Sequence, residues 1–322
     1  GMSYTLVATA KNEGPYLLEW VAYHWMIGFD NILMFQNDSD DYTDETLHIL
    51  DDLGILEYRY NRAPHGHQQV RAYKRAARRE SFKQSDWALA LDLDEFLHIH
   101  VGKGHLDDLF AALPESDIVL LNWRYFGHGD HADMADMLVT ERFQSTEYDD
   151  RITEVLTAFK AMFRPSHFDR CGVHKPPNAK VPLDQIKTCN GSGLIEGTFE
   201  RKNFRSKDPD RRKLAQINHY ITRDAAGFVL KSHRGSAHQA DRGIDKQYWR
   251  RRNFNDTFDS GLAARNGEIL EAMAELNARS DGRLEELRKK SLELHQHRFE
   301  KLLKEPVYKD LYEFCINAEA AA

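Results

Sequence analysis

Short apolar runs alternate with amphipathic segments through the first 125 residues of the chain. The apolar runs are rich in β-branched and aromatic residues, which favour strands, and they cover residues 4–9, 31–35, 55–60, 87–97 and 118–125. Between them, apolar residues recur at helical spacing over residues 17–26, 43–53, 68–82 and 106–113. Strands that alternate with helices are typical of parallel βαβ units. The pattern therefore predicts an α/β fold with a doubly wound, mostly parallel sheet and flanking helices.

The pattern changes twice in the rest of the chain. Residues 128–215 are irregular, with short apolar pieces such as residues 161–163, and we expect a mixed α/β portion that covers the edge of the sheet. Beyond Asp256 the pattern is helical, with an apolar stripe that we assign to core packing: Leu284, Leu287, Leu294, Phe299, Leu302 and Leu303. These changes predict a main domain over residues 1–240 and a helical C-terminal extension over residues 241–322 packed on it.

Composition and charge restrict the class of protein. The 322 residues are 41% hydrophobic, which is enough for a large core. No apolar run approaches the ~18 residues of a membrane helix. We therefore expect no transmembrane segment, and peripheral membrane contact stays open. No secretory signal pattern is present, and the three cysteines have no paired spacing: Cys171, Cys189 and Cys315. We expect a soluble cytoplasmic protein without disulfides or structural zinc.

The net charge of −7 hides one basic stretch, because residues 201–256 contain 15 Lys and Arg but only 6 Asp and Glu. Such a stretch is either a solvated face or a site for phosphate or an acidic acceptor. The chain as a whole is acidic, so we do not expect it to bind nucleic acid.

The strongest chemical signal is Asp92-Leu93-Asp94-Glu95, which follows an apolar run. In an extended segment Asp92 and Asp94 would point the same way, and their carboxylates would repel each other without a cation. Such oxygen ligands suit Mg²⁺ or Mn²⁺. The alternative is a solvated acidic turn in which Glu95 caps a helix. Polar loops at residues 11–14, 37–41 and 62–69 also follow predicted strands, where doubly wound sheets bind ligands.

Several motifs follow one another in a characteristic order. They include Lys11-Asn12-Glu13 and Asp92-Leu93-Asp94-Glu95-Phe96, with further pieces at residues 19–24, Gly28, residues 37–41, Gln69, Tyr73, residues 123–127, residues 141–143, Lys160, residues 164–165, His174, residues 218–220 and residues 231–235. This set resembles the GT-A glycosyltransferases of the family 2 superfamily, in the branch with a Lys-Asn-Glu start and an Asp-x-Asp-Glu-Phe motif. The resemblance spans residues 5–235 and does not reach the helices beyond Asp256.

The resemblance implies a GT-A-like fold and an inverting, metal-dependent transfer from a nucleotide-sugar, usually a UDP-sugar. It places the donor against Thr9, Lys11, Asn12, Glu13, Asp38, Gln69, Tyr73, Asp92, Lys231 and Arg234. It assigns Mn²⁺ or Mg²⁺ to Asp92, Asp94 and His219, since a neutral imidazole is a competent ligand. Lys231 and Arg234 would act on the charge of the departing diphosphate. Each of these residues also has an alternative role without a ligand. Residues 11–13 could only cap a helix, Gln69 could be an ordinary exposed helix residue, His219 could be a packed or surface residue, and Lys231 and Arg234 could belong to a solvated basic face.

The same resemblance implies an acceptor side near the end of the strand at residues 118–125. Its candidates are Trp123, Phe126 and Gly127, although such aromatic residues also occur in cores. His174 resembles a histidine near the acceptor. An inverting transfer needs a general base, and Asp130 stands near the right strand end, although nothing distinguishes it from Asp133 or Glu141. The acceptor could be a glycan, a lipid-linked sugar or a protein.

Three other functions compete with this interpretation. A nucleotidyltransferase would carry a glycine-rich basic loop after the first strand, but residues 9–14 contain one Gly and one Lys. A haloacid-dehalogenase-like phosphatase would carry its paired aspartates after the first strand, whereas here they follow the fourth. A catalytically silent nucleotide-sugar-binding protein is disfavoured by the intact Asp92, Asp94 and His219 but stays open.

Overall fold

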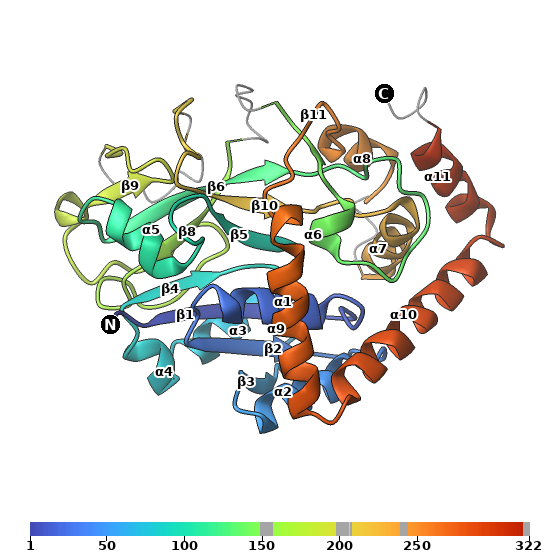
Figure 1. Cartoon of the computed structure of the whole chain (residues 1–322), viewed down its shortest axis with the longest axis horizontal. Helices are drawn as coiled ribbons and strands as arrows, with labels where there is room; N and C mark the ends of the chain where they lie inside the picture. Colours follow the sequence, from blue (N-terminus) through green and yellow to red (C-terminus); the bar gives the residue numbers. More distant parts are fainter. Residues whose placement is uncertain (149–156, 198–205, 207, 239–243, 318–322) are drawn as a thin grey trace.

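Among the described residues of this computed structural model, nine strands form one mixed sheet through the middle of the molecule (Figure 1). The structure describes residues 1–148, 157–197, 206, 208–238 and 244–317. The strand order is β3-β2-β1-β4-β8-β6-β10-β5, and β9 pairs with β6 beside this path. The strands are β1 Tyr4–Ala10, β2 Asn31–Gln36, β3 Glu57–Tyr60, β4 Trp87–Ala90, β5 Glu95–Ile99, β6 Ile118–Tyr125, β8 Phe159–Phe163, β9 Thr188–Asn190 and β10 Ala215–His219. A separate pair joins β7 Ser145–Thr146 to β11 Thr257–Phe258.

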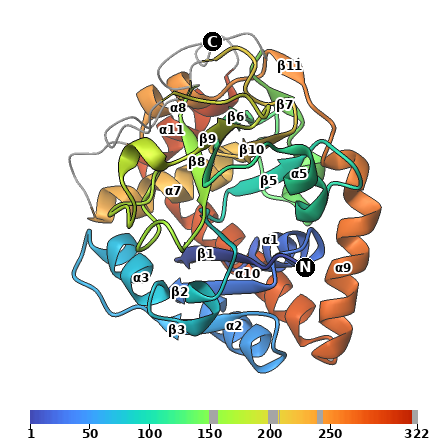
Figure 2. The ribbon, with the colours of Figure 1, turned by 90° about the vertical axis from the view of Figure 1, so that its left-hand side faces the viewer.

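Helices cover both faces of this sheet. They are α1 Leu17–Met26, α2 Thr43–Asp52, α3 Gln68–Ala76, α4 Glu80–Lys83, α5 Leu106–Ala112, α6 Val139–Arg142, α7 Ala225–His238, α8 Lys246–Arg252, α9 Asn266–Arg279, α10 Arg283–Leu302 and α11 Pro306–Ile316, with 3-10 turns at Leu183–Gln185 and Ala263–Arg265. Figure 2 shows α1 and α9 on one side of the parallel strands and α3 on the other. The predicted α/β class, with a mostly parallel sheet and flanking helices, is confirmed.

The side-chain alternation of β1 explains why two faces are covered. Leu6 and Ala8 lie in the larger core together with residues of α1, whereas Val7 lies in a second core with Ala72 and Tyr73 of α3. Successive side chains of a strand point to opposite faces. A strand that is apolar at consecutive positions therefore needs a helix on each side, as the parallel ladder β3-β2-β1-β4 has here.

Two elements predicted as continuous are broken. The strand predicted over residues 87–97 ends at Ala90 and restarts at Glu95, because the backbone N–H of Glu95 donates to the Asp92 carbonyl and closes a turn. After the turn, β5 pairs antiparallel with β10 instead of continuing along β1. The helix predicted over residues 68–82 becomes α3 and α4, because Arg79 adopts an extended conformation between them.

The irregular middle of the chain does more than cover an edge. Its strand β8 lies inside the sheet, antiparallel to both β4 and β6, and β10 lies between β6 and β5. The expectation that residues 128–215 only cover the sheet edge was wrong. The apolar piece at residues 161–163 belongs to β8, and Phe159 to Phe163 are buried throughout.

The C-terminal helices pack against the sheet domain at several places. Helix α9 lies along α1, α10 contacts α2 and α7, and α11 contacts α7 and α8 (Figure 1). Of the predicted apolar stripe, Leu284, Leu287, Phe299 and Leu302 are buried. The predicted helical extension is confirmed, while its boundary at residues 240 and 241 lies outside the described residues. Within the described ranges, no helix is both long and apolar enough to cross a membrane.

Candidate functional site

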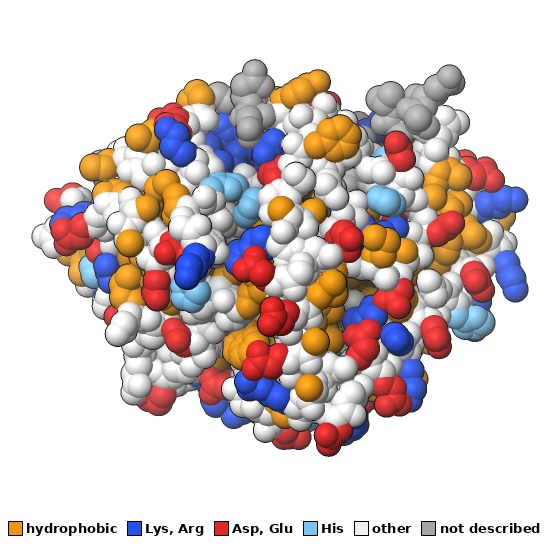
Figure 3. Space-filling view, viewed as in Figure 1, with side chains coloured by type: hydrophobic (Ala, Val, Ile, Leu, Met, Phe, Trp, Pro, Cys, Tyr) orange, Lys and Arg blue, Asp and Glu red, His pale blue; other side chains and the backbone are white. Residues whose placement is uncertain are grey.

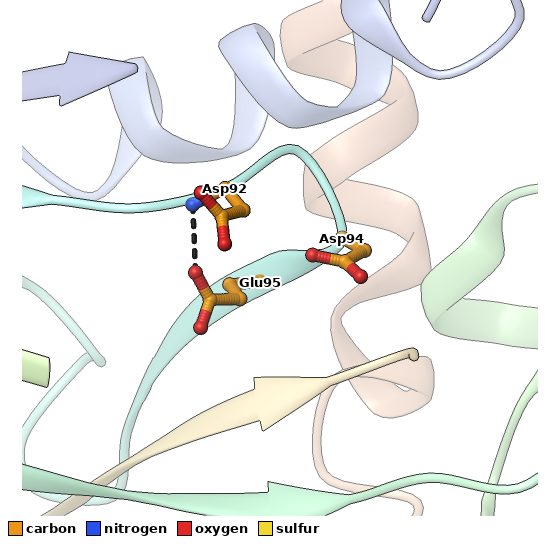
Figure 4. A group of neighbouring side chains, drawn as sticks. All are labelled: Asp92, Asp94 and Glu95. Atoms are coloured by element: carbon orange, nitrogen blue, oxygen red, sulfur yellow. Dashed lines mark hydrogen bonds between the residues drawn. The ribbon is translucent and has the colours of Figure 1, made fainter. Parts of the chain in front are cut away.

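The turn between β4 and β5 carries three carboxylates close together. Ligand atoms of Asp92, Asp94 and Glu95 all lie within 4.8 Å of one another (Figure 4). The Asp92 N–H donates to Glu95 Oε1 at 2.7 Å, so Glu95 closes the turn, with Asp92 where the chain enters it and Asp94 at its far end. The aspartates are neighbours because of this turn, and the prediction that they share one face of a continuous strand was wrong.

Asp92 lies between a glutamine and a buried lysine. Gln69 Nε2 donates to Asp92 Oδ1 at 3.1 Å, and Lys160 Nζ lies 3.8 Å from Asp92 Oδ2 and 3.6 Å from Glu95 Oε1. Burial disfavours charge on Lys160, but Asp92 and Glu95 outweigh it and raise its pKa. For Glu95 burial dominates over Lys160 and raises the pKa. The positive charge of the buried Lys160 therefore compensates part of the negative charge of Asp92 and Glu95.

Asp94 faces a histidine that is distant in sequence. His219 Nε2 lies 3.3 Å from Asp94 Oδ2, although 125 residues separate them. The antiparallel pairing of β10 with β5 places His219 opposite Glu95, beside the turn. Lys231 Nζ lies 4.0 Å from the same Asp94 oxygen. Burial opposes ionisation of Asp94, but His219 and Lys231 outweigh it and lower its pKa.

A half-buried arginine, Arg223, which the sequence did not single out, connects the turn to the loop after β1. Arg223 Nη1 lies 3.2 Å from Glu13 Oε2, and Arg223 Nη2 donates to the Leu93 carbonyl at 3.3 Å. Its guanidinium stacks on the Tyr16 ring, 3.6 Å from the ring centroid. Because Glu13 and Arg223 are 210 residues apart, no local pattern could have indicated this pair.

The loop after β1 is held by backbone contacts. Arg234 Nη1 donates to the carbonyls of Lys11 and Asn12 at 3.3 and 3.0 Å. Asn12 has a positive φ of 52°, and its side chain accepts a hydrogen bond from the Asp40 N–H at 2.9 Å. Thr9, at the end of β1, is half-buried.

Two other predicted donor residues differ in exposure. Asp38 is exposed after β2, with a positive φ of 54°, and accepts a hydrogen bond from the Tyr60 hydroxyl at 2.9 Å. Tyr73, by contrast, is only 3% exposed within the second core. Burial first, and then the nearby Asp92, raise the pKa of Tyr73 well above its ordinary value.

The predicted acceptor-side residues divide into two groups. The Trp123 ring lies 4.6 Å from the His219 ring and 5.4 Å from the His174 ring, so Trp123 connects both histidines. Phe126 is buried in the main core. A Cβ at Gly127 would clash with the Phe254 carbonyl oxygen, so close packing explains this glycine.

Asp130 is not brought to the acidic turn by any contact among the described residues. Its side chain is 98% exposed, and its ion-pair neighbour is His128, at 4.0 Å. His174 is closer to the site through Trp123, and its Nδ1 lies 2.9 Å from the Phe159 carbonyl oxygen.

The residues around the turn fit a divalent cation. Carboxylates and an imidazole are suitable ligands for Mn²⁺, and carboxylates for Mg²⁺. The contact between His219 and Asp94 matches two ligands that share one ion, since metal–ligand bonds of ~2 Å place neighbouring ligand atoms ~3 Å apart. Oε2 of the buried Glu95 has no hydrogen-bond partner among the described residues. The cluster of Asp92, Asp94 and Glu95 therefore contains one carboxyl oxygen that is available to a ligand.

We compared the sequence with models of known protein families to find the class of protein that contains this acidic turn. The family model described as glycosyltransferase family 92 matches residues 9–196, more than half of the chain. The chain belongs to glycosyltransferase family 92. This membership confirms the predicted enzyme class, while the resemblance to the family 2 superfamily stays a prediction. It also favours a glycosyltransferase over the two alternative enzyme classes.

Two curated plant members of glycosyltransferase family 92 match part of the chain. The protein from Ricinus communis is 28% identical over 95 residues, which cover 29% of this chain and 16% of that protein. The protein from Oryza sativa subsp. japonica is 33% identical over 95 residues, covering 27% and 15%. The matched segments thus span about one sixth of each relative.

Among solved structures, TarS from S. aureus is similar at 13% identity and a TM-score of 0.37, over 94% of this chain and 91% of that chain. TarS in complex with UDP-GlcNAc gives 13% identity and a TM-score of 0.33, over 94% and 92%. The scores are too low to add to the fold described above.

The family 92 match includes one half of the site and leaves out the other. The acidic turn and Lys160 lie inside residues 9–196, whereas His219, Lys231 and Arg234 lie beyond them. For these three residues the argument rests on their contacts with the turn and with the loop after β1.

Proposed function

We propose that this family 92 glycosyltransferase uses Mn²⁺ or Mg²⁺ to transfer a sugar from a UDP-sugar to an acceptor hydroxyl with inversion. One observation carries the proposal: the fold brings His219 to within 3.3 Å of Asp94 from 125 residues away. His219 packs on the Trp123 ring and also faces the carboxylate of Asp94, and this second contact supports a role as a ligand. The alternative of a His219 packed under the C-terminal helices does not describe this arrangement.

In this proposal Asp92, Asp94 and His219 hold the metal ion, which would supply positive charge to the diphosphate of the donor. Lys160 keeps the buried Glu95 compensated, so the acidic turn persists without the ion. Gln69 orients Asp92 through its hydrogen bond. Residues of the β1 loop and Asp38 would contact the nucleotide.

The chain's own cations would act on the leaving group. The acceptor oxygen forms a bond to the anomeric carbon as the bond from that carbon to the diphosphate oxygen breaks, and the diphosphate leaves with the electron pair. Lys231, next to Asp94, lies where this negative charge would grow. A base takes the acceptor proton. We assign this role to His174, the predicted acceptor-side histidine, and not to the predicted Asp130, because His174 shares the Trp123 ring with His219.

Calorimetric titration of UDP with and without Mn²⁺ tests the metal site. We expect metal-dependent binding to the wild type, and a loss of about 100-fold or more in the variants Asp92→Asn and Asp94→Asn. Asp52→Asn is a matched control, because Asp52 is exposed on α2. Unchanged UDP titrations in both site variants would refute the proposal.

Two further measurements address the donor and turnover. UDP should bind more tightly than ADP, GDP or CDP, and equal affinities would remove the uridine preference. Release of UDP from a UDP-sugar in the presence of Mn²⁺ should depend on Asp94. Tight donor binding without release, with or without added saccharides, would support the silent binding protein instead.

A further inference from the structure

A basic cavity of about 390 Å³ lies between α7 and α10, outside the acidic turn. We call it the α7–α10 cavity, and its lining residues are Asn12, Asp40, Leu230, His233, Arg234, His295, Arg298, Lys301 and Leu302. Its size falls within the range of small-molecule sites. None of the proposed metal ligands belongs to its lining.

The charges of this cavity are unbalanced. Asp40 is the one carboxylate in its lining and is already engaged by Arg298, which lies 3.0 Å from Oδ1 and donates to the Asp40 carbonyl at 3.0 Å. Arg234 is bound to two backbone carbonyls, and no described carboxylate lies within ion-pair distance of Arg234 or Lys301. Two positive charges therefore remain for a ligand.

The lining side chains are also held in place. His233 Nδ1 lies 3.0 Å from the Tyr308 hydroxyl, and His295 Nε2 lies 2.7 Å from Oδ2 of the buried Asp41. Arg298 is likewise fixed by Asp40. Because these side chains are already ordered, binding a ligand costs little further conformational entropy, which favours affinity. On the face shown in Figure 3, acidic and basic side chains are otherwise interspersed over most of the surface.

The α7–α10 cavity adjoins the donor site. A narrow neighbouring cavity contains Asp94, Arg223 and Lys231, and it shares Leu230, Arg234 and His295 with the α7–α10 cavity. A ligand held between α7 and α10 would therefore lie beside the proposed diphosphate position without occupying it.

We propose that the α7–α10 cavity binds an oxyanion group of the acceptor, so that the acceptor is an anionic saccharide carrying phosphate, sulfate or carboxylate. This inference rests on the proposed function, because it takes the acidic turn as the donor's place. The donor diphosphate has its own partners there in the metal ligands and Lys231. Lys301, which lines only the α7–α10 cavity, and Arg234, which lines both cavities, provide the charge for a second anion.

Titration of inorganic phosphate into the metal-free protein at low salt tests the anion site. We expect the affinity to fall by about tenfold or more in the double variant Arg298→Gln/Lys301→Gln, because Lys301 no longer donates to the anion and the loss of Arg298 leaves the Asp40 carboxylate free to repel it. Lys289→Gln is the matched control, since Lys289 is an exposed lysine of α10 outside the cavity lining. Equal phosphate affinity in the double variant and the wild type would overturn the proposal.

Two further measurements distinguish whether the α7–α10 cavity binds an anionic group of the acceptor or the diphosphate of the donor. Phosphate should still bind the wild type saturated with UDP and Mg²⁺, and the double variant should bind UDP as the wild type does. Competition between phosphate and UDP, or a parallel loss of UDP affinity, would assign the cavity to the donor and overturn the acceptor assignment. Absence of UDP binding to the wild type would refute the proposed function, whereas the phosphate arm reports on the cavity alone. If the double variant unfolds, Lys301→Glu supplies the same test, because Lys301 is exposed.

Discussion

A buried hydrogen-bonded pair, Asp41 and His295, connects the C-terminal helices to the loops of the proposed donor site, and breaking it should destabilise the fold. Asp41 is fully buried and accepts hydrogen bonds from His295 Nε2 at 2.7 Å, Thr43 Oγ1 at 2.6 Å and the Gly14 N–H at 2.9 Å. His295 belongs to α10, and 254 residues separate it from Asp41. The perturbation is His295→Ala.

The size of the effect follows from the ionisation of Asp41. Burial opposes its charge, but His295 and the hydrogen bonds of Thr43 and Gly14 outweigh burial and lower the pKa of Asp41 from 3.8 to about 2. That difference corresponds to about 2 kcal/mol in favour of the charged form in the folded state. Removing one partner of a buried pair typically costs about 3–5 kcal/mol. Since Asp41 keeps its other donors, we expect His295→Ala to cost about 2–3 kcal/mol.

Urea unfolding at neutral pH measures this loss. His297→Ala is the matched control, because His297 is an exposed histidine of the same helix. His295→Gln should recover part of the stability, since an amide can still donate to Asp41. A free energy of unfolding for His295→Ala within about 0.5 kcal/mol of the wild type, or an equal loss in His297→Ala, would refute the reasoning.

Acid should remove the same contribution. The folded-state pKa of Asp41 is lower than its ordinary value, so the stabilisation is complete above pH 4 and is lost as the pH falls toward 2. The difference between the wild type and His295→Ala should therefore shrink over that interval. A difference that stays constant from pH 5 to pH 2 would show that the charge of Asp41 is not its source.

Three further predictions concern other buried groups. Burial lowers the pKa of His24 from 6.5 to about 3, so the unfolded chain binds the proton at a higher pH than the folded chain does. The free energy of unfolding should therefore fall between pH 6.5 and pH 3, by up to about 1.4 kcal/mol per pH unit. Urea unfolding of His24→Gln should show a weaker dependence on pH over the same interval. Gly127→Ala should cost about 1–3 kcal/mol in the same assay, because its methyl group would meet the Phe254 carbonyl, and an unchanged stability would contradict that packing. Lys160→Met should destabilise the metal-free protein by about 3 kcal/mol by leaving the carboxyl groups of Asp92 and Glu95 without their shared cation, and Mg²⁺ should raise the melting temperature of this variant more than that of the wild type.

The sequence predicted the parts of the fold that depend on local pattern. The parallel strands and their helices follow from apolar periodicity, and the alternation of Leu6 and Val7 in β1 already requires two covered faces. The turn at Asp92 was not visible, because Leu91 and Leu93 continue the apolar run on both sides of it and both are buried. The hydrogen bonds that close this turn involve Glu95, whose neighbour Phe96 also looks like a strand residue.

Long-range pairings could not be derived from local pattern. β8 enters the sheet between β4 and β6, although nothing in its five residues distinguishes an interior strand from a covering one. For the site, the resemblance indicated His219, and in the structure its Nε2 lies 3.3 Å from Asp94 Oδ2. Burial of Tyr73 and Phe126 shows the limit of motif arguments, since a residue type does not tell on which side of a strand or helix the side chain lies.

The C-terminal third of the chain shapes the loop after β1 through three independent contacts. Arg234 of α7 binds the carbonyls of Lys11 and Asn12, and His295 of α10 binds the aspartate that accepts the Gly14 N–H. A side chain at Gly14 would clash with α10, so the loop and the helix are in direct contact there. A loop that must present fixed groups to a nucleotide gains from such support, because its conformation is then set before the ligand arrives. The family match ends at residue 196, yet the groups that fix this loop come from α7 and α10. The C-terminal helices therefore form part of the proposed donor site.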